Sequence, residues 1–258
     1  MRANPPEKSR RVFGGRANVP VLLALAITGT VLLHGVSDLP PMGNPTNPDK
    51  THVTPRYFEN GPEVIGARNL VAGVILNYRN YDTLAEVVVI FAALCAVIAL
   101  LGRHKRGVCR SIVDAAGERA GVVIRTVTRF LLPVILLFAA YTILHGKVSP
   151  GGGFQGAAVL GGSIIVFTLA FGMPESTRRI TLGLRVSFES FGVLIFGAIG
   201  LLAMALGANF LTLMLPGLPG ETAEPVRAVL LVLLEFGIGA SGGMVFTSIV
   251  FAMLREDG

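Results

Sequence analysis

The spacing of the charged residues is the feature that most constrains this chain. Lys, Arg, Asp and Glu make up only 15% of its 258 residues, and 52% of the residues are hydrophobic. The charges gather in short clusters, separated by apolar runs of about 18 to 25 residues, the length of helix that crosses a bilayer core of roughly 30 Å. Lipid offers no partner to backbone polar groups, so each run must satisfy its own. The sequence therefore predicts an all-α integral membrane protein.

Six such runs predict about six transmembrane helices. The first follows a basic leader but lacks a small-residue cleavage site, so we interpret it as a span, with a cleaved signal peptide as the alternative. With the N-terminus in the cytoplasm, 16 of the 22 Lys and Arg residues lie on the cytoplasmic side, which predicts that both termini are cytoplasmic. This topology accounts for the net charge of +6 without a nucleic-acid partner. The predicted spans are Val19–His34, Thr83–Leu101, Val127–Leu144, Gln155–Gly172, Val186–Gly207 and Arg227–Leu254.

A polar cytoplasmic connection at 102–123 divides the chain into two predicted modules. Residues 1–115 form a two-span module, and residues 116–258 form a four-span module with short connections. The outer loop at 38–62 contains six prolines, which disfavour regular structure. A short interfacial or re-entrant helix, about Glu63–Leu76, is expected after it, followed by the polar break NYRNYD. Because irregular backbone at membrane depth needs protein or water around it, we expect this break to face a partner or a hydrated cavity.

The segment SPGGGFQG joins the third and fourth spans. A phosphate-binding loop would follow a strand and keep a GxxxxGK[ST] or GxGxxG spacing, and neither condition is met here. Small residues spaced by four, as at Gly152 and Gly156 and at Ala157 and Gly161, instead favour close approach between helices. We therefore expect this segment to serve backbone packing.

Four carboxylates lie in or beside predicted spans, where ionisable side chains are rare and are candidates for function. Asp82 and Glu86 share one helical face near the outer side, and Asp82 has a second interpretation as a helix cap partnered by Arg79. Glu235 lies about 12 Å into the sixth span, either on an ion path or facing a neighbouring subunit. Glu189 lies one turn into the fifth span from the inner side. Because the four carboxylates lie at different depths, they cannot form one site, but they can form a series of sites across the membrane.

Cofactor and metal binding are not expected. The chain contains two cysteines, Cys95 and Cys109, which do not form a CxxC pair, and only four histidines. The sequence accordingly shows no catalytic site, and we do not expect an enzyme.

The third span and the segment after it resemble the B subunit of Mrp-type sodium/proton antiporters, a unit also found in related membrane-bound hydrogenases. The resemblance covers about 125–258 and departs from the family at Lys147, where the family has a histidine, with His145 on the other side of Gly146. A lysine keeps its positive charge near neutral pH, whereas a histidine titrates there. Lys147 therefore has two interpretations, a contact with lipid headgroups or a place in a proton relay. The matching residues are Arg129, Pro133, Tyr141, Gly146, Pro150, Gly151, Gly152, Gly153 and Phe154, with Gly156 two residues further on.

Residues 18–101 are similar to the last part of the antiporter's large A subunit, a part that is a separate small E subunit in membrane-bound hydrogenases. Asn77 replaces an aspartate of the family pattern, which removes one possible cation ligand. The matching residues are Asn69, Val71, Ile75, Leu76, Tyr78, Arg79, Tyr81, Asp82, Thr83, Leu84 and Glu86.

These resemblances imply an accessory subunit of a multi-subunit Na⁺/proton antiporter, or of an antiporter-like respiratory complex, in a prokaryotic inner membrane. Its partners would be other subunits, lipid and the transported Na⁺ or proton, and Glu86 would be the first candidate for the ion path. The alternative is a structural membrane component of a nickel–iron hydrogenase or formate-oxidising complex, without an ion role. A self-contained channel or transporter is a third hypothesis.

Overall fold

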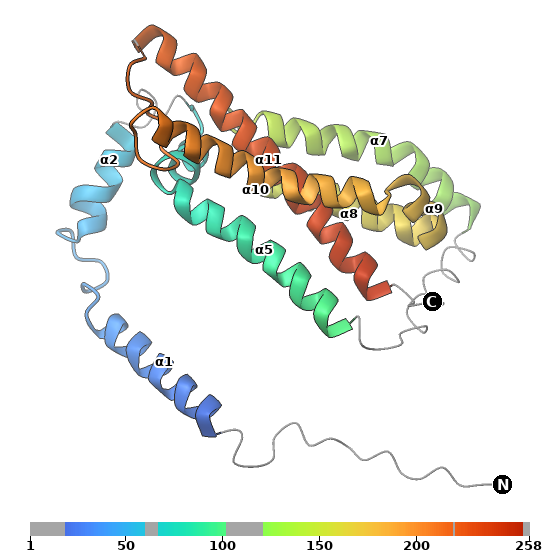
Figure 1. The fold of residues 1–258 in the computed structure, drawn as a ribbon, viewed down its shortest axis with the longest axis horizontal. Coiled ribbons are helices and arrows are strands. Elements are labelled where there is room, and N and C mark those ends of the chain that lie inside the picture. The colour runs from blue at the N-terminus through green and yellow to red at the C-terminus, as the bar shows by residue number, and fades with distance from the viewer. Residues whose placement is uncertain (1–18, 60–66, 102–120, 219, 255–258) are drawn as a thin grey trace. The chain divides into compact units, whose positions relative to one another are not determined.

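The computed structural model describes residues 19–59, 67–101, 121–218 and 220–254. The regular elements in these ranges are all helices, and six of them are long and apolar enough to span a membrane (Figure 1). The predicted class and number of spans are confirmed, whereas the cytoplasmic placement of both termini stays a prediction. The six helices are α1 (Val19–Ser37), α5 (Asn80–Leu101), α7 (Val122–Leu144), α8 (Gly153–Phe171), α10 (Leu182–Ala205) and α11 (Gly220–Leu254).

The chain separates into two compact units, Met1–Thr54 and Pro55–Gly258. The first unit contains α1, which has no buried residue, and the π-helical turn η2 (Asp49–Val53). The short helix α2 (Thr54–Glu59) begins where the units meet in sequence. The predicted module boundary near residue 115 lies outside the described residues.

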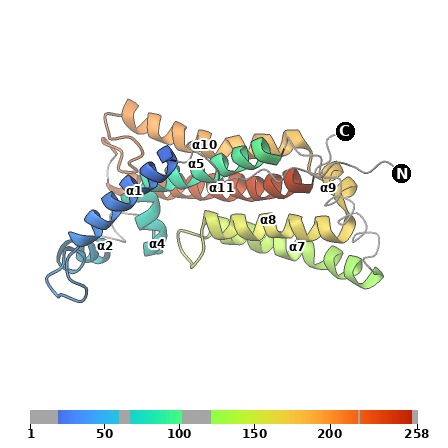
Figure 2. The same cartoon turned by 90° about the horizontal axis from the view of Figure 1, so that it is seen from below.

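Helix α11 is the central element of the second unit. It packs against α8, α10, α5 and α7, and α7 and α8 lie side by side in both ribbon views (Figures 1 and 2). The core between α10 and α11 is built from large apolar side chains such as Phe196, Leu231 and Leu234, each fully buried. Because α5 contacts both α10 and α11, the second span packs directly on the last two spans.

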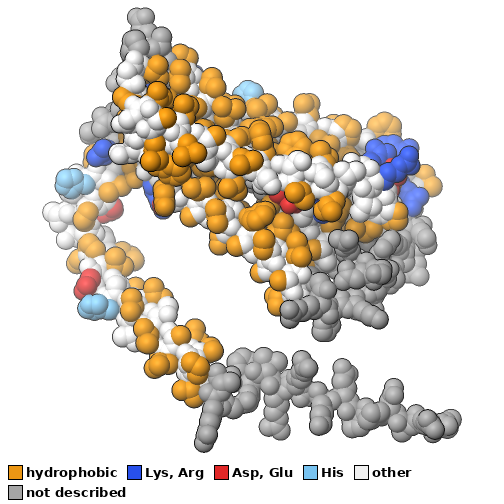
Figure 3. Space-filling view, in the orientation of Figure 1, with side chains coloured by type: hydrophobic (Ala, Val, Ile, Leu, Met, Phe, Trp, Pro, Cys, Tyr) orange, Lys and Arg blue, Asp and Glu red, His pale blue; other side chains and the backbone are white. Residues whose placement is uncertain are grey.

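Apolar side chains also cover much of the outside of the helices (Figure 3). On α7, Phe130 and Leu137 are more than 70% exposed, and on α10 Leu194 is 67% exposed. An apolar exterior of this kind is what a bilayer or a neighbouring membrane subunit covers.

The predicted break before the second span is held by protein contacts. A short helix, α4 (Leu70–Gly73), continues as the π-helical turn η3 (Val74–Tyr78) and ends where Arg79 leaves helical geometry. The next residue, Asn80, is buried and donates its side-chain amide to the Leu211 carbonyl at 2.9 Å. The break therefore faces the loop between α10 and α11; residues 63–66 of the predicted helix lie outside the described residues.

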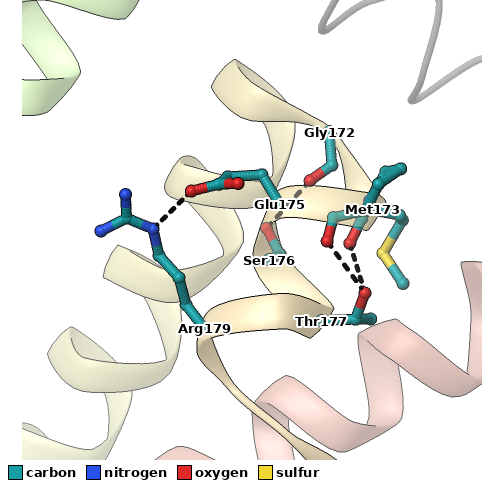
Figure 4. A network of polar contacts seen from close by, with 7 residues as sticks. Gly172, Met173, Glu175, Ser176, Thr177 and Arg179 are labelled. Atoms are coloured by element: carbon teal, nitrogen blue, oxygen red, sulfur yellow. Dashed lines mark hydrogen bonds and ion pairs between the residues drawn. The ribbon is translucent and has the colours of Figure 1, made fainter.

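A short helix not expected from the sequence, α9 (Met173–Arg179), connects α8 to α10 (Figure 4). It follows Gly172, whose φ of 87° favours glycine. The Ser176 hydroxyl donates to the Gly172 carbonyl, and Glu175 and Arg179 form an ion pair at 2.7 Å. This pair lowers the pKa of Glu175, so its small contribution to stability is present above the ordinary carboxyl pKa and is lost as the pH falls through the lowered value.

Replacing Gly156 by alanine tests the packing of α8 on α7. A Cβ at Gly156 would lie 2.2 Å from Ile143 Cγ1, whereas a Cβ at Gly162, on the same helix, would meet nothing within 4 Å. We expect Gly156→Ala to destabilise the protein by about 1–3 kcal/mol and Gly162→Ala to have little effect. Thermal unfolding in detergent, followed by circular dichroism, measures both; equal melting temperatures would contradict this packing.

Candidate functional site

A buried carboxylate on α11 lies beside the first residue of α8. Glu235 is only 1% exposed, and its Oε2 accepts a hydrogen bond from the Gly153 backbone N–H. Its other oxygen, Oε1, has no hydrogen-bond partner within the described part of the chain. The sequence left open whether Glu235 faces a neighbouring subunit, and in the structure it faces the glycine-rich segment of its own chain.

The glycines of this segment form the wall around the carboxyl group. A Cβ added at Gly146 would lie 2.9 Å from Oε1 of Glu235, and one at Gly152 would lie 3.2 Å from Oε2. Gly152 also has a φ of +150°, which side-chain-bearing residues rarely adopt. At Gly153 a Cβ would lie 2.6 Å from the Glu235 carbonyl oxygen. The run of glycines therefore lets the backbone close directly on α11 and its carboxyl group.

Asn69 fixes the same segment from the other side. Its side-chain amide donates to the Gly146 carbonyl at 2.7 Å and to the Ser149 carbonyl at 2.8 Å, and its backbone N–H donates to the Lys147 carbonyl at 2.9 Å. Its Oδ1 accepts from the backbone N–H of Val71 and so caps α4. One side chain thus joins the start of α4 to the segment that covers Glu235. We name residues 145–153 the glycine-rich loop.

The other predicted residues of the loop region have different surroundings. Lys147 is half-buried, Pro150 is exposed, and the His145 ring is stacked on Tyr141 with ring centroids 4.3 Å apart. Phe154 packs against the core between α10 and α11.

The remaining packing glycines contact α7. A Cβ at Gly151 would lie 3.1 Å from the Thr142 carbonyl oxygen, and Gly156 lies against Ile143 and Ala139. Because Gly151 and Gly156 have no side chains, the start of α8 can lie directly against the end of α7.

Glu189 belongs to a second polar cluster, between α10 and α11. It is 6% exposed and accepts a hydrogen bond from the Ser248 hydroxyl, which in turn accepts from the Arg185 guanidinium at 3.0 Å. Arg185 also lies over the Phe251 ring, 4.8 Å from its centroid. The sequence placed Glu189 one turn into the fifth span from the inner side, and the structure buries its side chain within the helix bundle.

Asp82 and Glu86 lie apart from both clusters, on the exposed face of α5. Asp82 forms an ion pair with Arg79 at 2.7 Å, and Glu86, one turn later, is exposed. The ion pair agrees with a structural role of Asp82 at the start of α5 and leaves its second role open. Asn77 is half-buried on η3, before the break.

No group of three or more His, Cys, Asp or Glu residues that could hold a metal ion occurs among the described residues. Cys95 is an exposed free cysteine on α5, while Cys109 lies outside the described ranges.

The structure joins residues that sequence reasoning kept apart. Asn69 appeared only as one match to a family pattern, and its contact with the glycine-rich loop spans almost 80 positions along the chain. Ser248 was not singled out, and Asn80 was noted only as part of the polar break NYRNYD and of the family comparison. A polar residue inside an apolar run was the available signal for Ser248, and the polar break was the signal for Asn80.

Comparison with known proteins places this arrangement in a class of membrane-complex subunits. Residues 123–250 match the protein family described as a domain related to the MnhB subunit of Na⁺/H⁺ antiporter. One chain in the structure of the membrane-bound sulfane sulfur reductase, an archaeal respiratory membrane complex, is 30% identical, with a TM-score of 0.64 and coverage of 93% of this chain and 99% of that chain. The chain therefore belongs to the family of membrane subunits that contains this domain.

Two further matches extend the resemblance to nearly the whole chain. A chain of the Mrp complex from Dietzia sp. is 25% identical, with a TM-score of 0.63 and coverage of 95% of this chain and 27% of that chain. The probable A/B subunit of a K⁺/H⁺ antiporter of Rhizobium meliloti is 26% identical over 214 residues, which are 74% of this chain and 20% of the relative. The chain spans less than two thirds of the length of the curated relatives that it matches first.

Substitution of Asn69 separates its two roles. Asn69→Asp keeps the oxygen that caps α4 but loses the amide that holds the glycine-rich loop, and Asn69→Ala loses both. Leaving the carbonyls of Gly146 and Ser149 without a donor weakens the loop by about 1–3 kcal/mol. With the native cysteines replaced by serine and Val148→Cys added, both variants should label at least tenfold faster with a membrane-impermeant maleimide.

Asn77→Ala changes another asparagine in the segment before α5. It is the control and should label at the same rate as the parent. Unchanged labelling of Asn69→Asp would contradict a loop held by the Asn69 amide.

Proposed function

We propose that this chain is an accessory subunit of a multi-subunit monovalent cation/proton antiporter or antiporter-like respiratory complex, with Na⁺ as the transported cation. Its membrane-spanning fold and its MnhB-related domain are those of antiporter subunits, which are transport components and not enzymes. The named relatives come from bacteria and archaea, which supports a multi-pass location in a prokaryotic cell membrane.

The observation that carries the proposal is the pair of exposed carboxylates on α5. Asp82 and Glu86 lie one turn apart in a helix of transmembrane length whose other exposed residues include Val89 and Leu100. A carboxylate that faces hydrocarbon is strongly unfavourable, so Glu86 requires a polar surface opposite it. A neighbouring subunit that completes an ion path supplies such a surface. The chain contributes one wall of this path and its partners contribute the other.

The arrangement of spans supports a fusion of two modules, 1–115 and 116–258. The Rhizobium meliloti relative, by its name, combines the A and B subunits in a single protein, and it matches 74% of this chain. The Asn69 contacts connect the segment before α5 with the glycine-rich loop of the MnhB-related domain. A fused chain would keep these two surfaces together during assembly of the complex.

A structural role without ion transport is the second candidate function. The observation in its favour is the 99% coverage of a chain from a respiratory membrane complex, a resemblance that extends over that whole subunit. Under this function the glycine-rich packing is essential and Glu86 only contacts a neighbouring chain. Its parent would be a redox-driven membrane complex, such as a nickel–iron hydrogenase.

Glu86→Gln separates the two functions. In membrane vesicles that carry the whole complex, we expect the variant to lower Na⁺-dependent proton exchange at least tenfold, because a neutral amide cannot hold or relay the cation. A native gel of the same samples measures assembly. Glu175→Gln, which removes a half-buried carboxylate outside the spans, is the matched control and should exchange normally.

Unchanged exchange in Glu86→Gln would favour the structural function. If K⁺ drives proton exchange and Na⁺ does not, the transported cation is K⁺, and the proposed role of Glu86 is unchanged.

A further inference from the structure

Glu235 is a buried acid held in a site that fits a carboxyl group. Oε2 is bonded to the first backbone N–H of α8, a helix of 19 residues, and Oε1 has no partner among the described residues although Glu235 is only 1% exposed. Buried polar atoms are nearly always hydrogen-bonded in folded proteins. Oε1 lies beside the backbone of Gly146, where a Cβ would come within 2.9 Å of it, and a buried carboxyl oxygen without a partner indicates that it acquires a ligand in one state of the protein.

The electrostatic environment of this position contains two opposing effects. The N-terminus of α8 carries partial positive charge and favours the carboxylate anion. Burial without a cationic partner favours the neutral acid. Neither of the ion pairs formed between described residues, Arg79–Asp82 and Arg179–Glu175, includes Glu235. The helix N-terminus thus favours the carboxylate form of Glu235, and burial favours its protonated form.

A metal cation is poorly suited to this site. Sodium needs several oxygen ligands, and the carbonyls of Gly146 and Ser149, which each accept a hydrogen bond from Asn69, keep only one further lone pair each. The partial positive charge at the N-terminus of α8 also repels a metal cation. A proton needs only Oε1 itself. Among the side chains that the structure describes, the titratable groups on α11, on the elements packed around it and on the glycine-rich loop are Tyr81, Asp82, Glu86, Cys95, Arg125, Arg129, Tyr141, His145, Lys147, Arg185, Glu189, Glu224 and Arg227.

We propose that Glu235 and the glycine-rich loop form a proton-exchange site in the MnhB-related domain. Oε1 forms an O–H bond with a proton delivered by water at the loop surface, and the same bond breaks when the proton leaves. The N-terminus of α8 then holds the negative charge that remains on the carboxylate. Participation of this exchange in transport rests on the proposed function, but the protonation itself does not.

A small cavity lies between α11 and its neighbours, and Glu235 is not among the residues that line it. Its lining includes Phe154 and Ile238, which lie beside Gly153, and Ser241 and Glu189 further along, and its volume of about 10 Å³ corresponds to roughly one water molecule. Glu189 is bonded in turn to Ser248, two turns further along α11.

Infrared difference spectroscopy of the purified complex, between acidic and alkaline buffers in H₂O and D₂O, tests the site directly. In the parent we expect a carboxylic-acid C=O band that shifts in D₂O and disappears at alkaline pH. Glu235→Gln should remove this band, because its amide keeps the shape and the acceptor for Gly153 but cannot titrate. Glu175→Gln, the control outside the spans, should retain this band. A band that persists in Glu235→Gln overturns the proposal.

Glu235→Asp keeps the experiment decisive if Glu235→Gln fails to assemble. The shorter acid still titrates, but it lies farther from Gly153, so the band should remain and shift; an unshifted band overturns the proposal. Proton exchange in vesicles should fall at least tenfold in Glu235→Gln and recover in part in Glu235→Asp. Normal exchange in Glu86→Gln alongside a missing band in Glu235→Gln would overturn the proposed role of Glu86 and leave this site standing.

Discussion

The hydrogen bonds of Asn69 are the interaction on which the rest of the second unit depends. Irregular backbone at membrane depth is stable only when protein or water satisfies its polar groups. Asn69 supplies three donors to the carbonyls of Gly146, Lys147 and Ser149. With these carbonyls satisfied, the chain reverses direction between α7 and α8 and starts α8 beside Glu235. The packing of α7, α8 and α11 and the buried carboxyl site follow from this one anchored turn.

A similar solution appears at the break before α5. There the buried Asn80 amide donates to the carbonyl of Leu211, a residue with the unusual φ of 63°. Leu211 is itself almost fully buried, so its side chain packs in the core while its backbone receives the amide. In both places an asparagine joins two irregular segments that are distant in sequence. The chain thereby places polar backbone inside the membrane without exposing it to lipid.

Much of the fold could be predicted from the sequence, because lipid imposes a simple length rule on apolar runs. Helix ends were less predictable: α7 begins at Val122, five residues before the expected Val127, because Arg125 and Arg129 lie within its first turns. Long arginine side chains reach the polar interface from inside a helix, so charge alone does not mark its end. Glu235 was found because charges in spans are rare, but Gly153, its partner, lies 82 positions away and no local pattern encodes that contact.

Helix α11 has a length that carries its own consequence. Its 35 residues extend over about 52 Å, while the hydrocarbon core of a bilayer measures about 30 Å. A helix longer than the hydrocarbon core crosses it tilted or projects beyond it, and its tilt depends on the helices packed against it and on the thickness of the membrane. Since α5, α8 and α10 all pack against α11, a thinner or thicker bilayer changes the angles at which they meet it. The lipid composition of the host membrane thus affects how the helix that carries Glu235 packs against its neighbours.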